Sequence, residues 1–558
     1  MRRIVSSIIV GCCIFVACGK GGDPAPPPPP PAPVNFGISS WTVNGVPGQT
    51  INYNVPRNAP IRFQFGAAIN RATVASNIRF QDNSAVAINA TVSYSNGDSV
   101  IILQPTSPLN YLSRYHVTVT DQLKSTTGGR LVTGTDLTLT TIIDSSRKFP
   151  IITDNELLEL VQKQTFKYFW DFGHPVSGLA RERNTSGETI TSGGSGFGMM
   201  SIVTGISRGF ITRPQGLTRL QTMVSFLKNT AQKFHGAFPH WLNGSTGVAI
   251  PFSTKDNGAD LVETSYLMMG LLTARQYFNT ADPAEVTLRN DINSIWNGVE
   301  WNWFRQNNQN VLYWHWSPNY NWEMNHPIRG WNECLITYVL AASSTTFSIP
   351  PIVYTAGWAG NGTNGFINGG SYYGIPLPLG PAYGGPLFFE HYSFMGIKPT
   401  GLSDAYANYQ TQTTNHTRIN YEHSRANPAN HFGYSDSVWG LTASDIPNGY
   451  AASSPTNDIG VIAPTAALSS FPYTPIESMK ALKFFYYVLG DKLWGQYGFK
   501  DAFSLKDIWF ADSYLAIDQG PIIVMIENYR TGLLWNLFTS CPEVKAGMLS
   551  LGFTAPYL

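Results

Sequence analysis

The residues of this chain best suited to chemistry are carboxylates that lie among tryptophan, glycine and other aromatic residues. The densest group is Asp256, Asp260 and Glu263, around the start of an apolar stretch with helical spacing. Asp260 and Glu263 are three positions apart, so in a helix their side chains lie on one face. We therefore expect these acids to crowd one helix end that faces a cleft. An ordinary alternative for Asp256 and Asp260 is negative charge that complements the positive end of the helix dipole.

Glu333 is a second candidate, because it follows a run rich in tryptophan and histidine and precedes an apolar helical stretch. Burial disfavours an ionised carboxylate, so a glutamate bounded by Trp331 and that helix should have a raised pKa. A raised pKa suits a general acid near neutral pH. The alternative is a buried ion pair of Glu333 with Arg329. The neighbouring side chains expected to bind a ligand are Trp314, Trp316, Trp322, His326, Arg329 and Trp331.

Asp518 stands just before a predicted long helix, in a context of tryptophan, tyrosine and glutamine. This position is typical of a helix N-cap, and it is equally suitable for a carboxylate in a sugar subsite. Two further runs of the sequence also place acids next to aromatic residues. The candidate ligand-binding residues in these three regions are Glu390, His391, Trp439, Asp445 and Gln519.

Composition and motifs exclude several classes of function. Charged residues make up 13% of the 558 residues and the net charge is +1, which argues against a nucleic-acid partner. Nucleotide-binding, serine-hydrolase and metalloprotease motifs are absent from the sequence, and the histidines lack ligand spacing, so we expect no metal and no cofactor. No obligate protein partner is evident. Two carboxyl groups suffice for glycoside hydrolysis, and 15 Trp and 27 Tyr offer surfaces for sugars. The sequence therefore favours a glycosidase, with a non-catalytic glycan-binding surface protein as the alternative class.

The elements that must position these acids are helices. Beyond Pro150, apolar residues recur at helical spacing, with long loops rich in Gly, Pro, Asn and Trp between the helices. Periodicity alone is compatible with a toroid of paired helices, a bundle or a solenoid. We expect the Gly-rich loop 360–385 to be a cleft wall or lid, or else a surface loop. The predicted helices are 155–170, 217–231, 259–278, 286–304, 330–342, 404–420, 475–489, 521–537 and 544–551.

The region 34–145 has short alternating strands between turn signals, which predicts a small all-β sandwich. It resembles bacterial Ig-like domains through the stretches 60–65, 77–80 and 111–119. With one Trp and one His, it offers little for catalysis. We expect a spacer or accessory module, with a carbohydrate-binding module as the alternative.

The N-terminus predicts a secreted, membrane-anchored protein. Arg2 and Arg3 precede an apolar run, 4–17, that is too short to span a bilayer and is typical of a signal peptide. The small residues before Cys18 resemble a bacterial lipobox, which implies a signal peptide 1–18 and lipidation of Cys18. An ordinary secretory signal is the alternative. A Pro-rich linker, 19–33, would then separate the first domain from the bacterial outer membrane. The sequence does not indicate whether the protein faces the periplasm or the cell exterior. Cys334 and Cys541 are expected to be buried free thiols.

Residues from about 151 to 558 resemble the bacterial glycoamylase-like domain and, more narrowly, glycoside hydrolase family 144 of endo-β-1,2-glucanases. The resemblance rests on long runs that span nearly the whole region. It implies an (α/α)6 toroid and hydrolysis of β-1,2-glucan to sophoro-oligosaccharides with inversion. The runs are 256–272, 313–344, 385–397, 439–450 and 509–535.

The same resemblance implies roles for individual acids. Glu333 would be the general acid and Asp518 the base, with Asp256, Asp260 and Glu263 binding the sugar or tuning the acid. Inversion needs carboxyl groups about 6.5–9.5 Å apart, or farther with a relay. If Glu333 and Asp518 lay on opposite faces, Asp445 with Glu263 would be the next pair. An α-1,4-specific, glucoamylase-like exo-enzyme and an exo-enzyme that releases sophorose are alternative activities.

Overall fold

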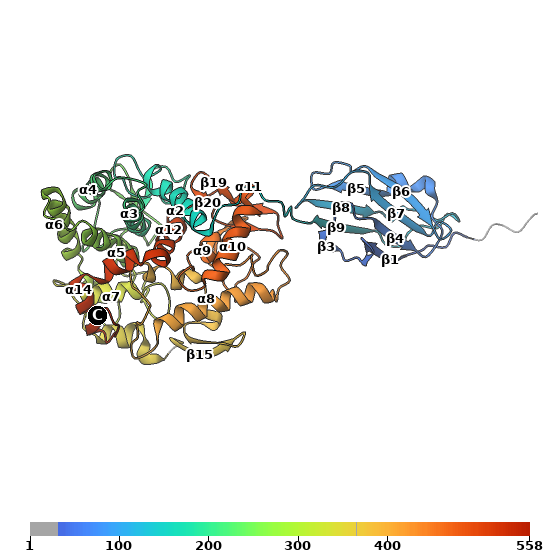
Figure 1. Ribbon diagram of the computed structural model, residues 1–558. Helices are drawn as coiled ribbons and strands as arrows, with labels where there is room; N and C mark the ends of the chain where they lie inside the picture. Colours follow the sequence, from blue (N-terminus) through green and yellow to red (C-terminus); the bar gives the residue numbers. More distant parts are fainter. Residues whose placement is uncertain (1–31, 364) are drawn as a thin grey trace, which may run out of the picture. The chain divides into compact units, whose positions relative to one another are not determined.

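The computed structural model describes residues 32–363 and 365–558, and the chain divides into two compact units. The first unit ends at Ile143, and the second comprises Asp144–Leu558 (Figure 1). The predicted signal peptide, its lipidation site Cys18 and most of the Pro-rich linker lie outside the described residues. Within the described part of the chain, no helix is both long and apolar enough to cross a membrane.

The first unit consists of two sheets around one apolar core, which agrees with the predicted Ig-like β-rich region. Strand β4 shows the pattern that builds this core, because Ile61, Phe63 and Phe65 alternate inward while the residues between them are half-buried. One sheet has the order β2-β1-β4-β7-β6 and the other β3-β9-β8-β5, with β3 and β9 parallel. The strands are β1 Ile38–Val43, β2 Val46–Pro47, β3 Ile51–Val55, β4 Ile61–Phe65, β5 Ile78–Asp82, β6 Ala90–Ser95, β7 Val100–Pro105, β8 Arg114–Val119 and β9 Thr135–Thr141.

The second unit is mainly helical, as predicted. Two of its helices begin with capping boxes, Thr153 with Glu156 and Thr212 with Gln215, which satisfy the free N–H groups of the first turn. The longer helices are α2 Asp154–Trp170, α3 Ser192–Ser207, α4 Arg213–Asn229, α5 Leu261–Tyr277, α6 Pro283–Asn297, α7 Leu335–Ser343, α8 Tyr409–Ala426, α10 Pro475–Tyr487, α12 Ala516–Thr531, α13 Leu533–Thr539 and α14 Pro542–Ser550.

Several predicted helix boundaries were wrong for identifiable reasons. The predicted helix 521–537 is two helices, because Gly532 adopts φ +70° between α12 and α13. Helix α12 also begins earlier, at Ala516, and carries Pro521 in its second turn. The predicted helix 330–342 begins at Leu335. Within the loop 360–385, strands β15 (Ile367–Tyr372) and β16 (Ile375–Leu379) form a hairpin that packs on α8.

Helix α3 was not predicted, although it lies at the centre of the second unit. It packs against α5 on one side and α12 on the other (Figure 1). Its sequence is rich in glycine, which disfavours a helix in isolation. The backbones of α3 and α5 touch at these glycines: a Cβ on Gly196 would lie 2.1 Å from the carbonyl O of Tyr266, and one on Gly270 would lie 2.2 Å from that of Gly196. Tertiary packing therefore overrides local propensity here.

We expect Gly270→Ala to destabilise the second unit by about 3 kcal/mol, because overpacking at a backbone contact forces the helices apart. Gly298→Ala is the matched control, since a Cβ there meets its nearest atom at 3.4 Å and the residue has φ −86°. Thermal and urea unfolding of both variants would measure the difference. Equal stability of the two variants would contradict the close approach of α3 and α5.

The contacts of the central helices continue around the unit. Helix α5 contacts α7, which contacts η7, a short 3-10 helix spanning Ser393–Met395. Helix α9 (Pro464–Leu468) contacts α12, which packs against α3. His391 lies just before η7, and its Nε2 is 3.0 Å from Ser470 Oγ, beyond the end of α9. The central elements thus follow one another from α3 through α5 and α7 to η7, which contacts α12, and α12 packs back against α3.

Candidate active site

The three acids of the densest group do gather at the start of α5. Asp260 is the N-cap of this helix, and its Oδ1 accepts hydrogen bonds from the N–H groups of Val262 (3.0 Å) and Glu263 (2.9 Å). The capping interpretation is therefore right for Asp260, but it uses one of the two carboxylate oxygens. The other oxygen, Oδ2, lies 3.1 Å from His240 Nδ1. Asp260 thus links the helix end to a titratable cluster.

Two histidines complete this cluster from other parts of the chain. Strand β13 (Ala259–Asp260) pairs with β14 (His315–Trp316), which places His315 opposite Asp260. His315 Nε2 lies 3.5 Å from Asp256 Oδ2, and His240 Nε2 lies 4.0 Å from Glu263 Oε1. We define the acid cluster as Asp256, Asp260, Glu263, His240 and His315.

Burial and mutual repulsion determine the charges in the acid cluster. Burial and the neighbouring Asp260 carboxylate raise the pKa of Asp256 to about 7. Burial opposes protonation of His240, but the carboxylates of Glu263 and Asp260 outweigh it and raise the pKa of His240 to about 9. Burial also raises the pKa of Glu263. Near neutral pH the imidazolium of His240 is therefore the cation that balances these acids.

Glu263 is held by the start of the neighbouring helix α3. Its Oε2 accepts hydrogen bonds from the Gly193 N–H (2.7 Å) and the Thr191 hydroxyl (3.3 Å). A Cβ on Gly193 would lie 2.6 Å from this oxygen, so only glycine allows the contact. Thr191 ends strand β10 (Thr189–Thr191), which pairs with β11 (Trp241–Asn243) directly after His240. The unpredicted helix and this small sheet thus position Glu263 and His240 together.

Among the described residues, His240, Asp256 and Asp260 form a group that could hold a metal ion. Their ligand atoms all lie within 4.8 Å of one another. Asp260 already uses one oxygen as a helix cap and the other for His240. A protonated His240 accounts for the charge of this group, and the absence of a metal requirement stays a prediction.

Glu333 lies just before α7 and is partly exposed. Its carbonyl O accepts a hydrogen bond from the Ser393 hydroxyl, and the Tyr266 hydroxyl is 3.5 Å away. Burial, together with repulsion from Asp260 and Glu263, raises the pKa of the Glu333 carboxyl to about 7. No ion pair with Arg329 occurs in the described residues, and Arg329 is exposed. Glu333 can therefore keep a proton near neutral pH, as a general acid requires.

One interpretation predicted that Asp518 is the N-cap of its helix. Asp518 lies instead inside the first turn of α12. Leu515 occupies the N-cap position. The carboxyl of Asp518 is hydrogen-bonded to that of Asp501, and both are almost fully buried. Asp501 Oδ2 also accepts the backbone N–H of Asp445 (2.7 Å). Burial and the neighbouring Asp501 raise the pKa of Asp518 well above its usual range.

Tyr392 connects the two groups of acids. Its pKa is raised first by burial and then by Asp518, Tyr450, Glu333 and Glu263, so all three carboxyls lie within electrostatic range of its hydroxyl. Its ring packs on Phe197 of α3 and on Tyr266 of α5. Glu333 and Asp518 consequently face one region of the unit and not opposite ends. This arrangement is that of a site with two carboxyl groups, one of which keeps its proton.

Comparisons with known proteins identify the family. The family model described as "Putative glucoamylase" matches residues 325–542, and that described as "Bacterial Ig-like domain" matches residues 42–141. A solved structure of an endo-β-1,2-glucanase from Chitinophaga pinensis, with sophorotriose and glucose, is 51% identical with a TM-score of 0.71. The match covers 73% of this chain and 100% of that one. The chain belongs to glycoside hydrolase family 144.

Two further similar proteins come from Parabacteroides distasonis. A solved β-1,2-glucanase is 37% identical with a TM-score of 0.70, over 95% of this chain and 74% of that one. A curated exo β-1,2-glucooligosaccharide sophorohydrolase acting at the non-reducing end is 47% identical over 425 residues, or 72% of this chain. This chain spans 58% of the length of that curated relative. These glycoside hydrolase relatives thus include endo-acting and exo-acting enzymes.

Several residues predicted to bind substrate are buried in this family 144 chain, and they have polar atoms bonded inside the protein. Glu390 Oε2 and Gln519 Oε1 are exceptions, because they have no partner among the described residues. Trp331 Nε1 donates to Glu390 Oε1 (3.0 Å), and the same oxygen lies 2.8 Å from His416 Nδ1. Trp439 Nε1 donates to the Glu477 carbonyl O (3.3 Å). The predicted residues that the structure buries in this way are Trp331, Glu390, His391, Trp439 and Gln519.

The remaining predicted binding residues lie near the acid cluster or at the surface. Trp314 is partly buried and stacks on His315 and on the exposed His326. Asp445 pairs with Arg183 (3.2 Å), so it is held in an ion pair next to Asp501. Trp316 and Trp322 are half-buried and pack on Trp303.

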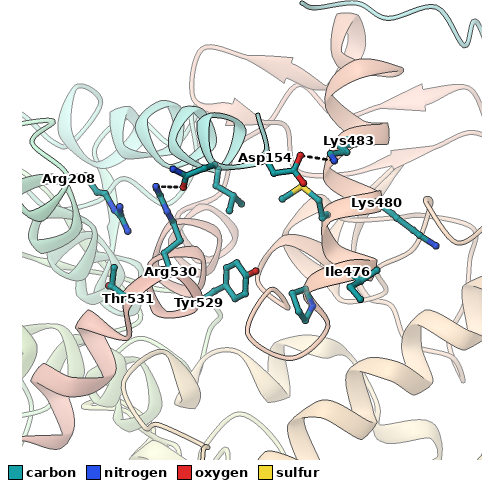
Figure 2. Close-up of a pocket in the computed structure, with 12 residues that line it drawn as sticks. Asp154, Arg208, Ile476, Lys480, Lys483, Tyr529, Arg530 and Thr531 are labelled. Carbon is teal, nitrogen blue, oxygen red and sulfur yellow. Dashed lines mark hydrogen bonds and ion pairs between the residues drawn. The ribbon is translucent and has the colours of Figure 1, made fainter. Parts of the chain in front are cut away.

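A large pocket of the second unit lies away from these acids. It has a volume of about 1000 Å³ and is lined by residues from α2, α10 and the C-terminal end of α12 (Figure 2). Along α12, Tyr529 is eleven residues beyond Asp518, or about 16 Å at 1.5 Å per residue. The charged residues that line the pocket are paired, as in Lys483 with Asp154 (2.6 Å) and Arg530 with Glu159 (2.7 Å). The pocket therefore lacks the free acid that hydrolysis requires.

Sequence reasoning missed four residues that the structure brings to the site: His240, Tyr392, Asp501 and Arg183. His240 lies between Pro239 and Trp241, a context similar to the runs that were singled out, so composition could have indicated it. Asp501 lies between Phe499 and Phe503, in a run that also contains Trp494 and Tyr497, so its aromatic context could have indicated it as well. Its role depends on a contact with α12 that no local pattern encodes.

Proposed function

We propose that this chain hydrolyses β-1,2-glucan with inversion, with Glu333 as the general acid and Asp518 as the base. The observation that carries the proposal is that the Tyr392 hydroxyl lies within electrostatic range of both carboxyls. Glu333 has a pKa of about 7, so a substantial fraction keeps a proton at neutral pH. The solved family 144 relative with sophorotriose and glucose supports β-1,2-linked glucose as the substrate.

In this mechanism, Glu333 donates its proton to the glycosidic oxygen as the bond to the anomeric carbon breaks. Asp518 accepts a proton from the water whose oxygen forms the new bond to that carbon. The acid cluster has two roles in this proposal. Its negative charges help to raise the pKa of Glu333, and the protonated His240 can donate a hydrogen bond to a sugar hydroxyl.

We infer that the central helices form the inner ring of an (α/α)6 toroid. The support is the closed sequence of contacts from α3 through α5, α7, η7 and α12 back to α3, with α9 packed on α12. The carboxyls of Glu263, Glu333 and Asp518 come from the first turns of α5 and α12 and from the residues just before α7. Helices that begin at one end of a ring would bring these residues to one cleft.

The two exo-acting alternatives differ in what supports them. Release of sophorose from chain ends remains compatible, because one relative is a sophorohydrolase that acts at the non-reducing end. Action on α-1,4-glucan is favoured by the word glucoamylase in the description of the family model. Endo action is therefore part of the proposal, and the lengths of the early products distinguish it from exo action.

A panel of purified β-1,2-, β-1,3-, β-1,4- and α-1,4-glucans tests the proposal, with products followed over time by chromatography. We expect cleavage of β-1,2-glucan alone, with sophoro-oligosaccharides of several lengths appearing early. Early release of sophorose alone would replace the endo assignment by the exo one. Cleavage of starch without action on β-1,2-glucan would refute the proposal, and binding without cleavage would favour a glycan-binding protein.

We also propose that Cys18 carries a lipid that anchors the enzyme to the outer membrane of a bacterial cell. The signal-like residues 4–17 and the small residues before Cys18 support this. The full chain should fractionate with membranes, and Cys18→Ala should move it to the soluble fraction while β-1,2-glucan hydrolysis is retained. A wild-type protein that is processed and remains soluble would refute the anchor.

A further inference from the structure

Asp501 is a buried acid that the mechanism above does not yet use. It lies in the turn between β20 (Gly498–Phe499) and β21 (Phe503–Ser504), and it is 1% exposed. Its carboxyl makes two contacts: it accepts the Asp445 N–H at 2.7 Å, and it is hydrogen-bonded to the carboxyl of Asp518. Asp518 is 2% exposed, and its Oδ2 has no donor among the described residues.

Two hydrogen-bonded carboxyls away from water cannot both be ionised, because like charges at this distance repel strongly. A hydrogen bond between them also requires a proton, since neither carboxylate can donate without one. Burial raises the pKa of Asp501 to about 7, and burial with the neighbouring Asp501 raises the pKa of Asp518 well above its usual range. The pair therefore holds one proton in common, as in other enzymes with paired aspartates.

The charged and titratable groups around this pair do not replace the proton. Arg183, from the segment before β10, is the nearest cation, but it pairs with Asp445 (3.2 Å) and with Glu182 (3.0 Å). Tyr450 of β18 (Gly449–Ala452) and Tyr392 both have pKa values well above 10, primarily through burial, so they are neutral. Asp445 adds a further negative charge, which favours retention of the shared proton.

We propose that Asp501 is a positioning residue that shares one proton with Asp518: the proton rests on Asp518 in the free enzyme and moves to Asp501 when Asp518 accepts a proton from water. This inference rests on the proposed function. In the reaction, water gives one proton to Asp518 and its oxygen bonds to the anomeric carbon, while Glu333 gives one proton to the leaving oxygen. The pair then carries two protons and Glu333 none. Transfer of one proton through solvent restores the starting state.

Asparagine and alanine at position 501 separate this role from a structural one. The side-chain amide in Asp501→Asn can still accept the Asp445 N–H, and its NH2 group can donate to ionised Asp518 in place of the shared proton. Asp501→Ala offers no such donor, so buried Asp518 should ionise at higher pH than in Asp501→Asn. We expect Asp501→Asn to keep kcat/KM within about tenfold of wild type. In Asp501→Ala the acidic limb of the pH profile should lie about one unit above that of Asp501→Asn, a tenfold lower rate at acidic pH.

A second measurement does not depend on activity. Infrared difference spectra at pH 7, without substrate, should show a smaller protonated-carboxyl signal in Asp501→Asn than in wild type. Glu285→Gln is the matched control, because Glu285 is buried but paired with Arg213, which holds its pKa at about 2. That variant should change neither the infrared signal nor the pH profile.

Two results would overturn the inference: an unchanged protonated-carboxyl signal in Asp501→Asn, or equal rate losses at every pH in the Asn and Ala variants. The infrared result separates this inference from the proposed function. If wild-type enzyme failed to cleave β-1,2-glucan, the function would be refuted, while the infrared signal would still report whether the pair shares a proton.

Discussion

Glu333→Gln should lower kcat on β-1,2-glucan by about 10³-fold or more, because glutamine cannot donate a proton to the leaving oxygen. The amide has nearly the same shape, so the affinity for sophoro-oligosaccharides should remain within a few-fold of wild type. Initial rates and calorimetric binding on the same preparations would measure both quantities. Loss of turnover with retained binding is the signature of a general acid.

The pH dependence of wild type gives an independent check on Glu333. Its folded-state pKa is about 7, so the fraction that carries a proton falls as the pH rises through 7. We expect kcat/KM to decline above this pH. Turnover in Glu333→Gln close to that of wild type would remove Glu333 from the acid role, and it would favour another carboxyl or the glycan-binding alternative.

Asp518→Asn should have the second largest effect, a loss in kcat of about 10²–10⁴-fold, because the amide cannot accept the proton of the attacking water. The comparison variant is Asp445→Asn. Asp445 is held by Arg183 and by the Ser513 hydroxyl, so its loss should disturb the site without removing the base. We expect this second variant to retain at least tenfold more activity than Asp518→Asn, at equal protein stability.

A reversed order of these two variants would contradict the assignment of Asp518. If Asp445→Asn and Glu263→Gln were the inactive variants while Asp518→Asn turned over normally, the base and acid would be the alternative pair. Unfolding curves of every variant separate loss of chemistry from loss of fold, since Asp445, Asp501 and Arg183 lie in one network.

The sequence predicted the helical class and the gathering of Asp256, Asp260 and Glu263, because these depend on local spacing. It did not predict α3, since glycines such as Gly196 disfavour a helix until α5 packs against them. The same limit applies to Asp501, whose partner Asp518 is seventeen positions away on another element.

Aromatic context did not distinguish buried residues from partly exposed ones. Trp439 and His391 lie in runs that carry the family resemblance, yet both are buried and bonded within the core. Such runs combine site residues with the residues that hold the site, and sequence alone does not separate the two. Burial and hydrogen-bond partners do, which is why His240 and not His391 is placed with the acids.

NMR of the first-formed product tests the central claim most directly. Purified enzyme is mixed with β-1,2-glucan, and the anomeric protons of the new reducing ends are recorded before mutarotation equilibrates them. Inverting hydrolysis by Glu333 and Asp518 predicts that the α-anomer appears first and then decays toward equilibrium. Initial accumulation of the β-anomer would contradict this account, because it would require a nucleophilic carboxylate in place of a base.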